Sequence, residues 1–188
     1  MAMTPDQWAA EVRRRIGINE GCRLTMYLDT MGIPTIAYGF NLRDGDAQAI
    51  LKKAGVTDVA SVIAGRTALT QAQADNTFAQ MLPGYITNAK TTLNTGVFDK
   101  LNDARRFVIV DMVYNLGVAG FLGFPSARRA INSAVTATST AAAHTFYGQA
   151  ADQMIDSAWY TQVGNRAKRN VAMMRNGTWV NANGDGSA

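Results

Sequence analysis

The sequence has little of what disulfide-linked, zinc-binding or membrane-spanning proteins need. Its 188 residues include one cysteine, Cys22, and one histidine, His144. A single cysteine excludes an internal disulfide and a zinc site with several cysteine ligands, and we expect no metal and no cofactor. No run approaches about eighteen apolar residues, and residues 1–17 lack the apolar segment of an export signal. This pattern predicts a soluble, unprocessed protein.

The charge balance is modestly basic. Lys and Arg number 18 against 14 Asp and Glu, which gives a net charge of +4. Such an excess favours polyanionic partners without identifying one. No zinc finger, aromatic RNA-binding signature or long basic helix accompanies it, so we expect no nucleic-acid partner.

A helix is predicted at the start of the chain. Residues 4–7, T-P-D-Q, combine an N-cap threonine, a proline at the first helical position and a reciprocal capping residue. Apolar residues then recur four positions apart, at Trp8, Val12 and Ile16. We expect this helix to end near residues 19–21.

Alternation of apolar and polar residues from 22 to 42 predicts a β-hairpin. One strand carries Leu24, Met26 and Leu28, and after a turn region, D-T-M-G, the other carries Ile36, Tyr38 and Phe40. Pro34 falls near the start of the second strand, where a missing amide donor is best tolerated on an edge. The sheet is expected to be small and partly exposed.

The rest of the chain has mainly helical patterns. We expect short helices near 46–53 and 58–64, a long helix over 70–90 that Pro83 kinks or divides near a junction of lobes, and a buried helix over 103–117. Residues 132–143 are low in complexity and indicate a loop or a weak helix. The last residues, 181–188, have no apolar groups to hold them and are expected to form a flexible tail.

Two carboxylates near the hairpin are candidates for acid–base chemistry. Glu20 ends the first helix, where the helix dipole disfavours a negative charge and so suits a proton donor. Asp29 lies in the turn nine residues later, and Thr35 follows on the second strand, where its hydroxyl could hold a water. Spacing alone leaves ordinary roles open: a solvated helix end for Glu20 and a turn former for Asp29.

The surrounding pattern resembles the catalytic signature of phage-type lysozymes. Residues 19–40 read N-E-G-C-R-L-T-M-Y-L-D-T-M-G-I-P-T-I-A-Y-G-F, and their glutamate, aspartate, threonine and glycines match this family of muramidases in order and spacing. Two further blocks resemble the family, A-R-R-F-V-I-V-D-M-V-Y-N-L-G at 104–117 and W-Y-T-Q-V-G-N-R-A-K-R at 159–169, followed by R-N-G-T-W at 175–179. The resemblance therefore covers nearly the whole chain.

The resemblance implies a mainly α (α+β), lysozyme-like fold with two lobes. Residues 1–180 would form the lysozyme domain, with a small αβ lobe at about 18–75 and a helical lobe at about 76–180 that includes the first helix. The implied reaction is inverting hydrolysis of the β-1,4 bond between N-acetylmuramic acid and N-acetylglucosamine in peptidoglycan. The implied catalytic residues are Glu20 as general acid and Asp29 with Thr35 on the water-activating side.

The resemblance also implies residues of the glycan groove and shows two departures. Asn41, Tyr114, Asn115 and Gln153 would line the groove, and Arg166 would lie near Glu20. The family's histidine after the hairpin glycine is replaced by Phe40, and its T-I-G becomes Thr35-Ile36-Ala37. Neither change removes a catalytic carboxylate.

Other functions remain open at this point. A cysteine peptidase or amidase would need Cys22 activated by His144, whereas a lytic transglycosylase or a non-catalytic glycan-binding module would not need both carboxylates. Basic side chains could attract anionic wall or outer-membrane polymers, or serve only solubility; these are Arg128, Arg129, Arg166, Lys168 and Arg169. We expect a monomer, made in a host cytoplasm and released to the wall through a holin pore.

Overall fold

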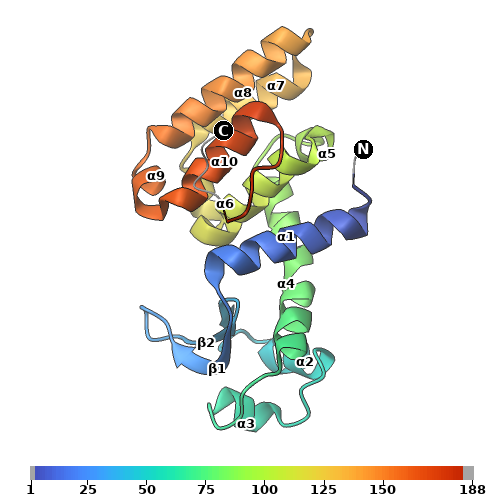
Figure 1. Ribbon diagram of the computed structural model, residues 1–188, viewed down its shortest axis with the longest axis vertical. Coiled ribbons are helices and arrows are strands. Elements are labelled where there is room, and N and C mark those ends of the chain that lie inside the picture. The colour runs from blue at the N-terminus through green and yellow to red at the C-terminus, as the bar shows by residue number, and fades with distance from the viewer. Residues whose placement is uncertain (1–2, 184–188) are drawn as a thin grey trace. The chain divides into compact units, whose positions relative to one another are not determined.

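The computed structural model describes residues 3–183 (Figure 1). The elements are, in order, α1 (Pro5–Glu20), β1 (Arg23–Leu28), β2 (Pro34–Ala37), β3 (Phe40–Asn41), α2 (Ala47–Lys53), α3 (Val59–Ile63), α4 (Gln71–Thr91), α5 (Val97–Lys100), α6 (Asp103–Leu122), α7 (Pro125–Thr136), α8 (Thr140–Ile155), α9 (Ala158–Val163) and α10 (Asn165–Asn176). The expected mainly α fold with a small β part is confirmed. Most of the expected tail, residues 184–188, lies outside the described residues.

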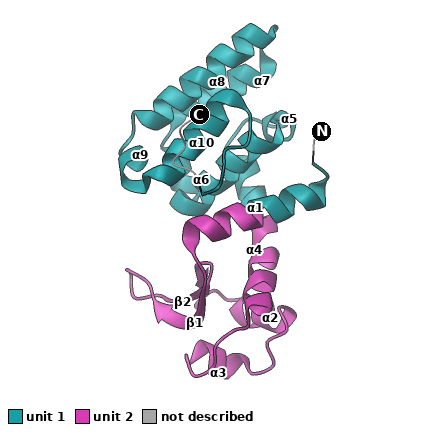
Figure 2. Ribbon diagram, in the orientation of Figure 1, with its two compact units in different colours: residues 1–12, 84–188 teal, residues 13–83 magenta. Residues whose placement is uncertain are grey.

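The chain divides into two compact units (Figure 2). The smaller unit is residues 13–83 and contains the sheet, α2 and α3. The larger unit combines residues 1–12 with 84–188 and contains α5 to α10. Helices α1 and α4 contribute residues to both units.

Helix α1 forms where the capping residues predicted it. The amide of Thr4 donates to Oε1 of Gln7 at 2.9 Å, and the amide of Gln7 donates to Oγ1 of Thr4 at 3.3 Å. These reciprocal bonds satisfy amides that have no partner inside the helix. The predicted apolar stripe is buried along its length, at Trp8, Val12 and Ile16. The beginning, end and buried face of this helix are therefore confirmed.

The sheet has three antiparallel strands in the order β1-β2-β3, so the prediction of a two-stranded hairpin was incomplete. The predicted second strand was also too long, because β2 ends at Ala37 and Phe40 belongs to β3. Positive φ angles of 55° at Ala37 and 93° at Gly39 reverse the chain there. Pro34 begins β2, which is the central strand, and the first residue of a strand tolerates a missing amide donor.

The core of the smaller unit lies between the sheet and the short helices. Its buried side chains come from β2, β3, α2, α3 and the start of α4, and they include Ile36, Phe40, Leu51, Val59 and Val62. The predictions of helices near 46–53 and 58–64 are confirmed by α2 and α3. This core holds one side of the sheet and so fixes the strands beside the candidate residues.

The larger unit packs around α6, whose side chains from Phe107 to Val113 are buried in succession. A helix buried on most sides matches the helix predicted at 103–117, although α6 continues to Leu122 past a break in helical geometry at Gly117. Helix α8 packs against both α7 and α10 (Figure 1). Residues 132–143 contain the end of α7 and the start of α8, which Ser139 caps through a bond from the amide of Ala142 at 3.1 Å.

Helix α4 runs through Pro83 as one element, so the proline does not divide it. The two units meet in sequence between Pro83 and Gly84. Within residues 3–183, no single helix is both long and apolar enough to span a membrane. Helices α6 and α7 meet the length and composition criteria only as a pair bent by 105°, which is weak evidence because buried core helices do the same.

Candidate functional site

Glu20 is the last residue of α1, and its side chain is exposed. Gly21 follows with a φ of 70°, which glycine adopts without strain, and its amide donates to the carbonyl oxygen of Gly17 at 3.0 Å. This glycine ends the helix and turns the chain toward β1. The carboxyl group of Glu20 is therefore accessible to a large substrate.

Asp29 directly follows β1 and shapes the turn that leads to β2. Its Oδ1 accepts hydrogen bonds from the amides of Met31 at 2.8 Å and Ile33 at 2.9 Å. Its Oδ2 accepts none from residues 3–183. Asp29 therefore does form the turn, which was the alternative to a catalytic role. This role uses only one carboxylate oxygen and orients the other.

Thr35 is joined to Asp29 through the backbone of Ile33. The hydroxyl of Thr35 donates to the carbonyl oxygen of Ile33 at 2.9 Å, and the amide of Asp29 donates to the same oxygen at 3.0 Å. Thr35 is 4% exposed and lies opposite Tyr27 on β1. The structure thus brings Asp29 and Thr35 together, whereas Glu20 precedes β1, at the strand's other end.

Asn41, predicted to bind glycan, lies directly opposite Thr35 in the pairing of β2 with β3. Its Oδ1 accepts from the amide of Arg43 at 2.8 Å, and its Nδ2 donates to Oδ1 of Asp44 at 2.9 Å. Arg43 also donates through Nη2 to the carbonyl oxygen of Gly32 in the Asp29 turn, at 3.2 Å. No pattern in the sequence predicted this contact.

Both departures from the family pattern have a structural consequence in the smaller unit. Phe40 is 1% exposed and belongs to the apolar core with Ile36 and Leu42. An apolar ring therefore fills the position where the family has a titratable histidine. Ala37 has a φ of 55°, in the left-handed region that a glycine would adopt without strain.

Residues 18–175 match the family model described as phage lysozyme. The chain belongs to the phage lysozyme family. It is 28% identical over 172 residues to the pre-baseplate central spike protein Gp5 of Enterobacteria phage T4. The aligned region covers 88% of this chain and 27% of that protein. It is 24% identical over 176 residues to a probable T4-type lysozyme 1 of Dictyostelium discoideum. The aligned region covers 90% of this chain and 96% of that protein.

The chain spans about a quarter of the spike protein's length but nearly all of the Dictyostelium protein's. Membership of the phage lysozyme family supports a lysozyme-like function, that of a glycoside hydrolase with peptidoglycan as its substrate. The mainly α fold with a small β part is consistent with this family.

Three groove residues predicted from the phage lysozyme pattern lie on helices of the larger unit. Tyr114, on α6, packs its ring 4.5 Å from that of Tyr85. Asn115 is exposed, and its Oδ1 accepts from the indole nitrogen of Trp159 at 2.9 Å. Gln153 is exposed on α8 and lines a pocket of about 290 Å³. Their contact with glycan stays a prediction.

Arg166, which was predicted to lie near Glu20, is on α10 and belongs to a buried polar cluster. Its Nε and Nη2 bond to the two carboxylate oxygens of Asp111, each at 2.9 Å, and Nδ2 of Asn170 adds a bond at 2.7 Å. The guanidinium thereby joins α10 to the buried face of α6. The expectation that Arg166 lies near Glu20 stays a prediction.

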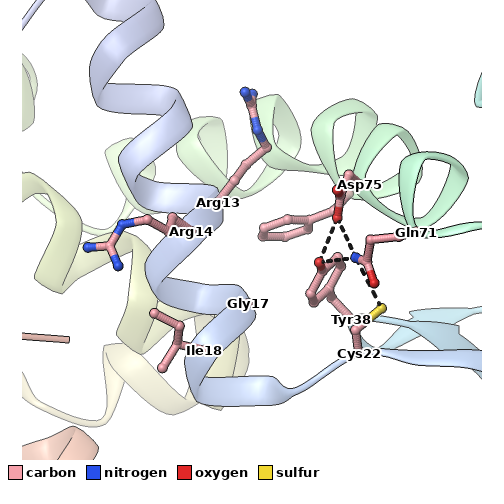
Figure 3. Close-up of a pocket in the computed structure, with 9 residues that line it drawn as sticks. Arg13, Arg14, Gly17, Ile18, Cys22, Tyr38, Gln71 and Asp75 are labelled. Carbon is pink, nitrogen blue, oxygen red and sulfur yellow. Dashed lines mark hydrogen bonds between the residues drawn. The ribbon is translucent and has the colours of Figure 1, made fainter. Parts of the chain in front are cut away.

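A pocket of about 520 Å³ lies in the smaller unit between residues of α1, the sheet and α4 (Figure 3). Tyr38 donates to Oδ1 of Asp75 at 2.6 Å, and Nε2 of Gln71 donates to the Tyr38 oxygen at 2.8 Å. Burial, followed by the bond to Asp75, raises the pKa of Tyr38, so its hydroxyl keeps the proton. Among the described residues, Glu20, Asp29 and Thr35 do not line this pocket.

The pocket also holds Cys22, which the peptidase alternative would use as a nucleophile. Burial raises the pKa of its thiol, although a contact with Nε2 of Gln71 at 3.8 Å opposes the shift. A catalytic cysteine needs a lowered pKa, and the chain's one histidine, His144, belongs to the larger unit. Within residues 3–183, no three His, Cys, Asp or Glu side chains gather as metal ligands would.

Proposed function

We propose that this chain hydrolyses the β-1,4 bond between N-acetylmuramic acid and N-acetylglucosamine in bacterial peptidoglycan, and thereby lyses bacteria. Family membership supports the lysozyme-like chemistry. The observation that carries the mechanism is the arrangement of Asp29, whose Oδ1 is fixed by two amides while Oδ2 accepts no hydrogen bond from residues 3–183. A pre-oriented carboxylate oxygen suits the activation of a water molecule.

In the proposed reaction, Glu20 protonates the oxygen of the leaving sugar while the glycosidic bond breaks. A water held by Oδ2 of Asp29 and Oγ1 of Thr35 attacks the anomeric carbon from the opposite face of the ring. Because the Thr35 hydroxyl donates to the carbonyl oxygen of Ile33, its oxygen is left to accept a hydrogen bond from this water. The water passes a proton to Asp29, and the configuration at the anomeric carbon inverts.

We also propose that Asn41 and the larger unit's Tyr114, Asn115 and Gln153 bind the glycan. The support is strongest for Asn41, which lies opposite Thr35 in the sheet. Arg166 is proposed to act near Glu20 by holding the packing of α10 on α6 through Asp111. Because peptidoglycan lies outside the cell membrane, the proposed enzyme acts after release from the host cytoplasm through a holin pore, as a monomer.

The deciding experiment digests purified peptidoglycan with the wild type and with Glu20→Gln, and identifies the products by mass spectrometry. We expect reducing N-acetylmuramic acid ends from the wild type and a rate at least about a thousandfold lower for the variant, because the amide cannot donate a catalytic proton. The matched control is Asp46→Asn, which removes an exposed carboxylate of the same unit that makes no cap hydrogen bond.

Each alternative predicts a different product. 1,6-Anhydro ends would indicate a lytic transglycosylase, in which the sugar's own hydroxyl replaces the water. Glycan binding without any soluble product would indicate a binding module. Substantial activity in Glu20→Gln would overturn the assignment of the acid.

A further inference from the structure

The larger unit contains a second polar pocket, apart from the residues proposed for catalysis. It has a volume of about 570 Å³ and lies between the loop after α4, α5 and one face of α7. Three cationic side chains line it, Lys100, Arg128 and Arg129, together with uncharged hydrogen-bonding groups. No Asp or Glu lines it among the described residues, so its charge is wholly positive.

Arg128 is held in a fixed orientation at this pocket. Its Nε donates to the backbone carbonyl oxygen of Thr92 at 2.6 Å. Asn132 is held similarly, because its Oδ1 accepts from the amide of Asn94 at 3.1 Å. With these atoms used, the terminal guanidinium nitrogens of Arg128 and the amide nitrogen of Asn132 are left to donate to a ligand.

The other two cations carry charge that this part of the chain does not neutralise. The side chains of Lys100 and Arg129 are exposed and form no hydrogen bond or ion pair with residues 3–183. The neighbouring carboxylate of Asp99 is already paired with Lys90 at 2.8 Å. The pocket therefore offers pre-oriented donors and unpaired positive charge, which together suit an anion rich in oxygen acceptors.

A smaller pocket of about 290 Å³ adjoins the first, since Arg129 and Ser133 line both. This smaller pocket presents the half-buried ring of Phe146 with the amide side chains of Gln149 and of Gln153, the latter also proposed to bind the peptidoglycan strand. An apolar ring beside amide groups is a surface on which a sugar can place its C–H face while its hydroxyls bond at the edge. The cationic pocket is therefore continuous with a surface suited to a saccharide.

We propose that these two pockets bind a phosphate-bearing glycan, with a phosphate group at Lys100, Arg128 and Arg129 and an adjoining sugar at Phe146. A single phosphate would fill only part of the cationic pocket, so a polymer with repeated phosphates suits the space better than a free ion. The site goes beyond hydrolysis, because it would attach the protein to a charged polymer that it does not cleave. Wall teichoic acid and the phosphorylated core of lipopolysaccharide share this chemistry.

The test measures binding by isothermal titration calorimetry at low salt, first with sodium tripolyphosphate as a probe of the cationic pocket. We expect Lys100→Ala and Arg129→Ala each to weaken binding about tenfold, because each removes one charge-assisted contact. Neither side chain forms a hydrogen bond or an ion pair with residues 3–183, so both variants should fold. The matched control is Lys52→Ala with Lys53→Ala, which removes two exposed charges on α2 in the other unit.

A second set of titrations identifies the polymer. The affinities for purified wall teichoic acid and for lipopolysaccharide core oligosaccharide are compared. The glycan that binds more tightly is assigned as the ligand of the two pockets. Phe146→Ala should weaken binding of that glycan several-fold and leave tripolyphosphate binding unchanged, because only the glycan has a sugar to place on the ring. Arg128→Lys keeps the charge but loses the bond to Thr92, and should weaken both ligands.

Three results would overturn the proposal: wild-type affinity for tripolyphosphate in the double variant Lys100→Ala/Arg129→Ala, an equal loss in the α2 control, or tighter binding of duplex DNA than of either glycan. Hydrolysis is measured separately on peptidoglycan stripped of teichoic acid. A wild-type protein that hydrolyses peptidoglycan but does not bind tripolyphosphate would contradict only this proposal. One that binds tripolyphosphate but does not hydrolyse peptidoglycan would contradict only the proposed function.

Discussion

Two aspartates in the two units show how the same side chain can be left available or fully bonded. Asp29, in the turn of the smaller unit, is half-buried and uses Oδ1 for two backbone amides, while Oδ2 accepts no bond from residues 3–183. Asp111, on α6 of the larger unit, is fully buried, and both of its oxygens accept bonds from Arg166 or Asn170.

The hydrogen bonds of each aspartate determine whether its carboxylate can act on a substrate. A buried carboxylate with every oxygen bonded to a side chain contributes to packing and cannot reach a reacting water. A turn carboxylate held on one side by main-chain donors is oriented, yet its second oxygen can still accept a proton. We therefore expect changes at Asp29 to reduce the rate and changes at Asp111 to reduce the free energy of unfolding.

Among changes to the two aspartates, the largest expected effect is that of Asp29→Asn on catalysis. The amide still accepts the turn bonds through its oxygen, but it cannot take a proton from water, so the rate should fall by about a thousandfold. Digestion of purified peptidoglycan measures this rate, and urea unfolding should show a stability within about 1 kcal/mol of the wild type. A large loss of stability with retained activity would reverse the roles assigned to the two aspartates.

Asp111→Ala should have the next largest effect, on stability. It leaves the buried guanidinium of Arg166 without its carboxylate, and breaking such a pair costs about 3–5 kcal/mol. Asp111→Asn keeps the shape and one acceptor and should cost less. Denaturant unfolding measures both variants.

Asp152→Ala supplies the control for Asp111→Ala, because Asp152 pairs with Arg175 at the exposed surface. Exposed ion pairs contribute about 1 kcal/mol or less. Equal losses of stability in the two alanine variants would contradict the importance given to burial of the Asp111 pair.

Features of α1 that depend on neighbouring residues were predicted correctly from the sequence. The capping residues at 4–7 and the spacing of Trp8, Val12 and Ile16 fixed the beginning and the buried face of α1, because both depend on residues within a few positions of each other. The glycine after Glu20 marked the end of that helix. The position of Glu20 at the end of α1 followed from these local signals.

Contacts made through main-chain atoms, or between residues far apart in the sequence, could not be predicted from the sequence. Ile33 joins Asp29 to Thr35 through its carbonyl oxygen, and a backbone atom leaves no mark on residue type. Strand β3 was missed because it is two residues long and depends on pairing with β2. The partners Asp111 and Arg166 are 55 positions apart; the one available signal was a charged residue inside an apolar run.

Thr35→Val tests the link between the Asp29 turn and the sheet. The change keeps the shape of the side chain but removes the bond to the Ile33 carbonyl oxygen and the acceptor proposed for the water. We expect a loss of about 1 kcal/mol in stability and about tenfold in peptidoglycan digestion. Thr35→Ser keeps the hydroxyl and should recover most of the rate; failure of serine to do so would remove the hydroxyl from the mechanism.

The smallest effect concerns Cys22, whose thiol is made less reactive by burial. Burial raises the pKa of the thiol, so at pH 7 to 8 the folded protein contains less thiolate than a free cysteine would. A disulfide reagent should therefore label the native protein several-fold more slowly than the urea-unfolded chain, and the native rate should rise with pH. Cys22→Ala should digest peptidoglycan at the wild-type rate, because the proposed proton transfers involve only Glu20, Asp29 and Thr35; faster labelling of the native state would contradict the suppressed reactivity.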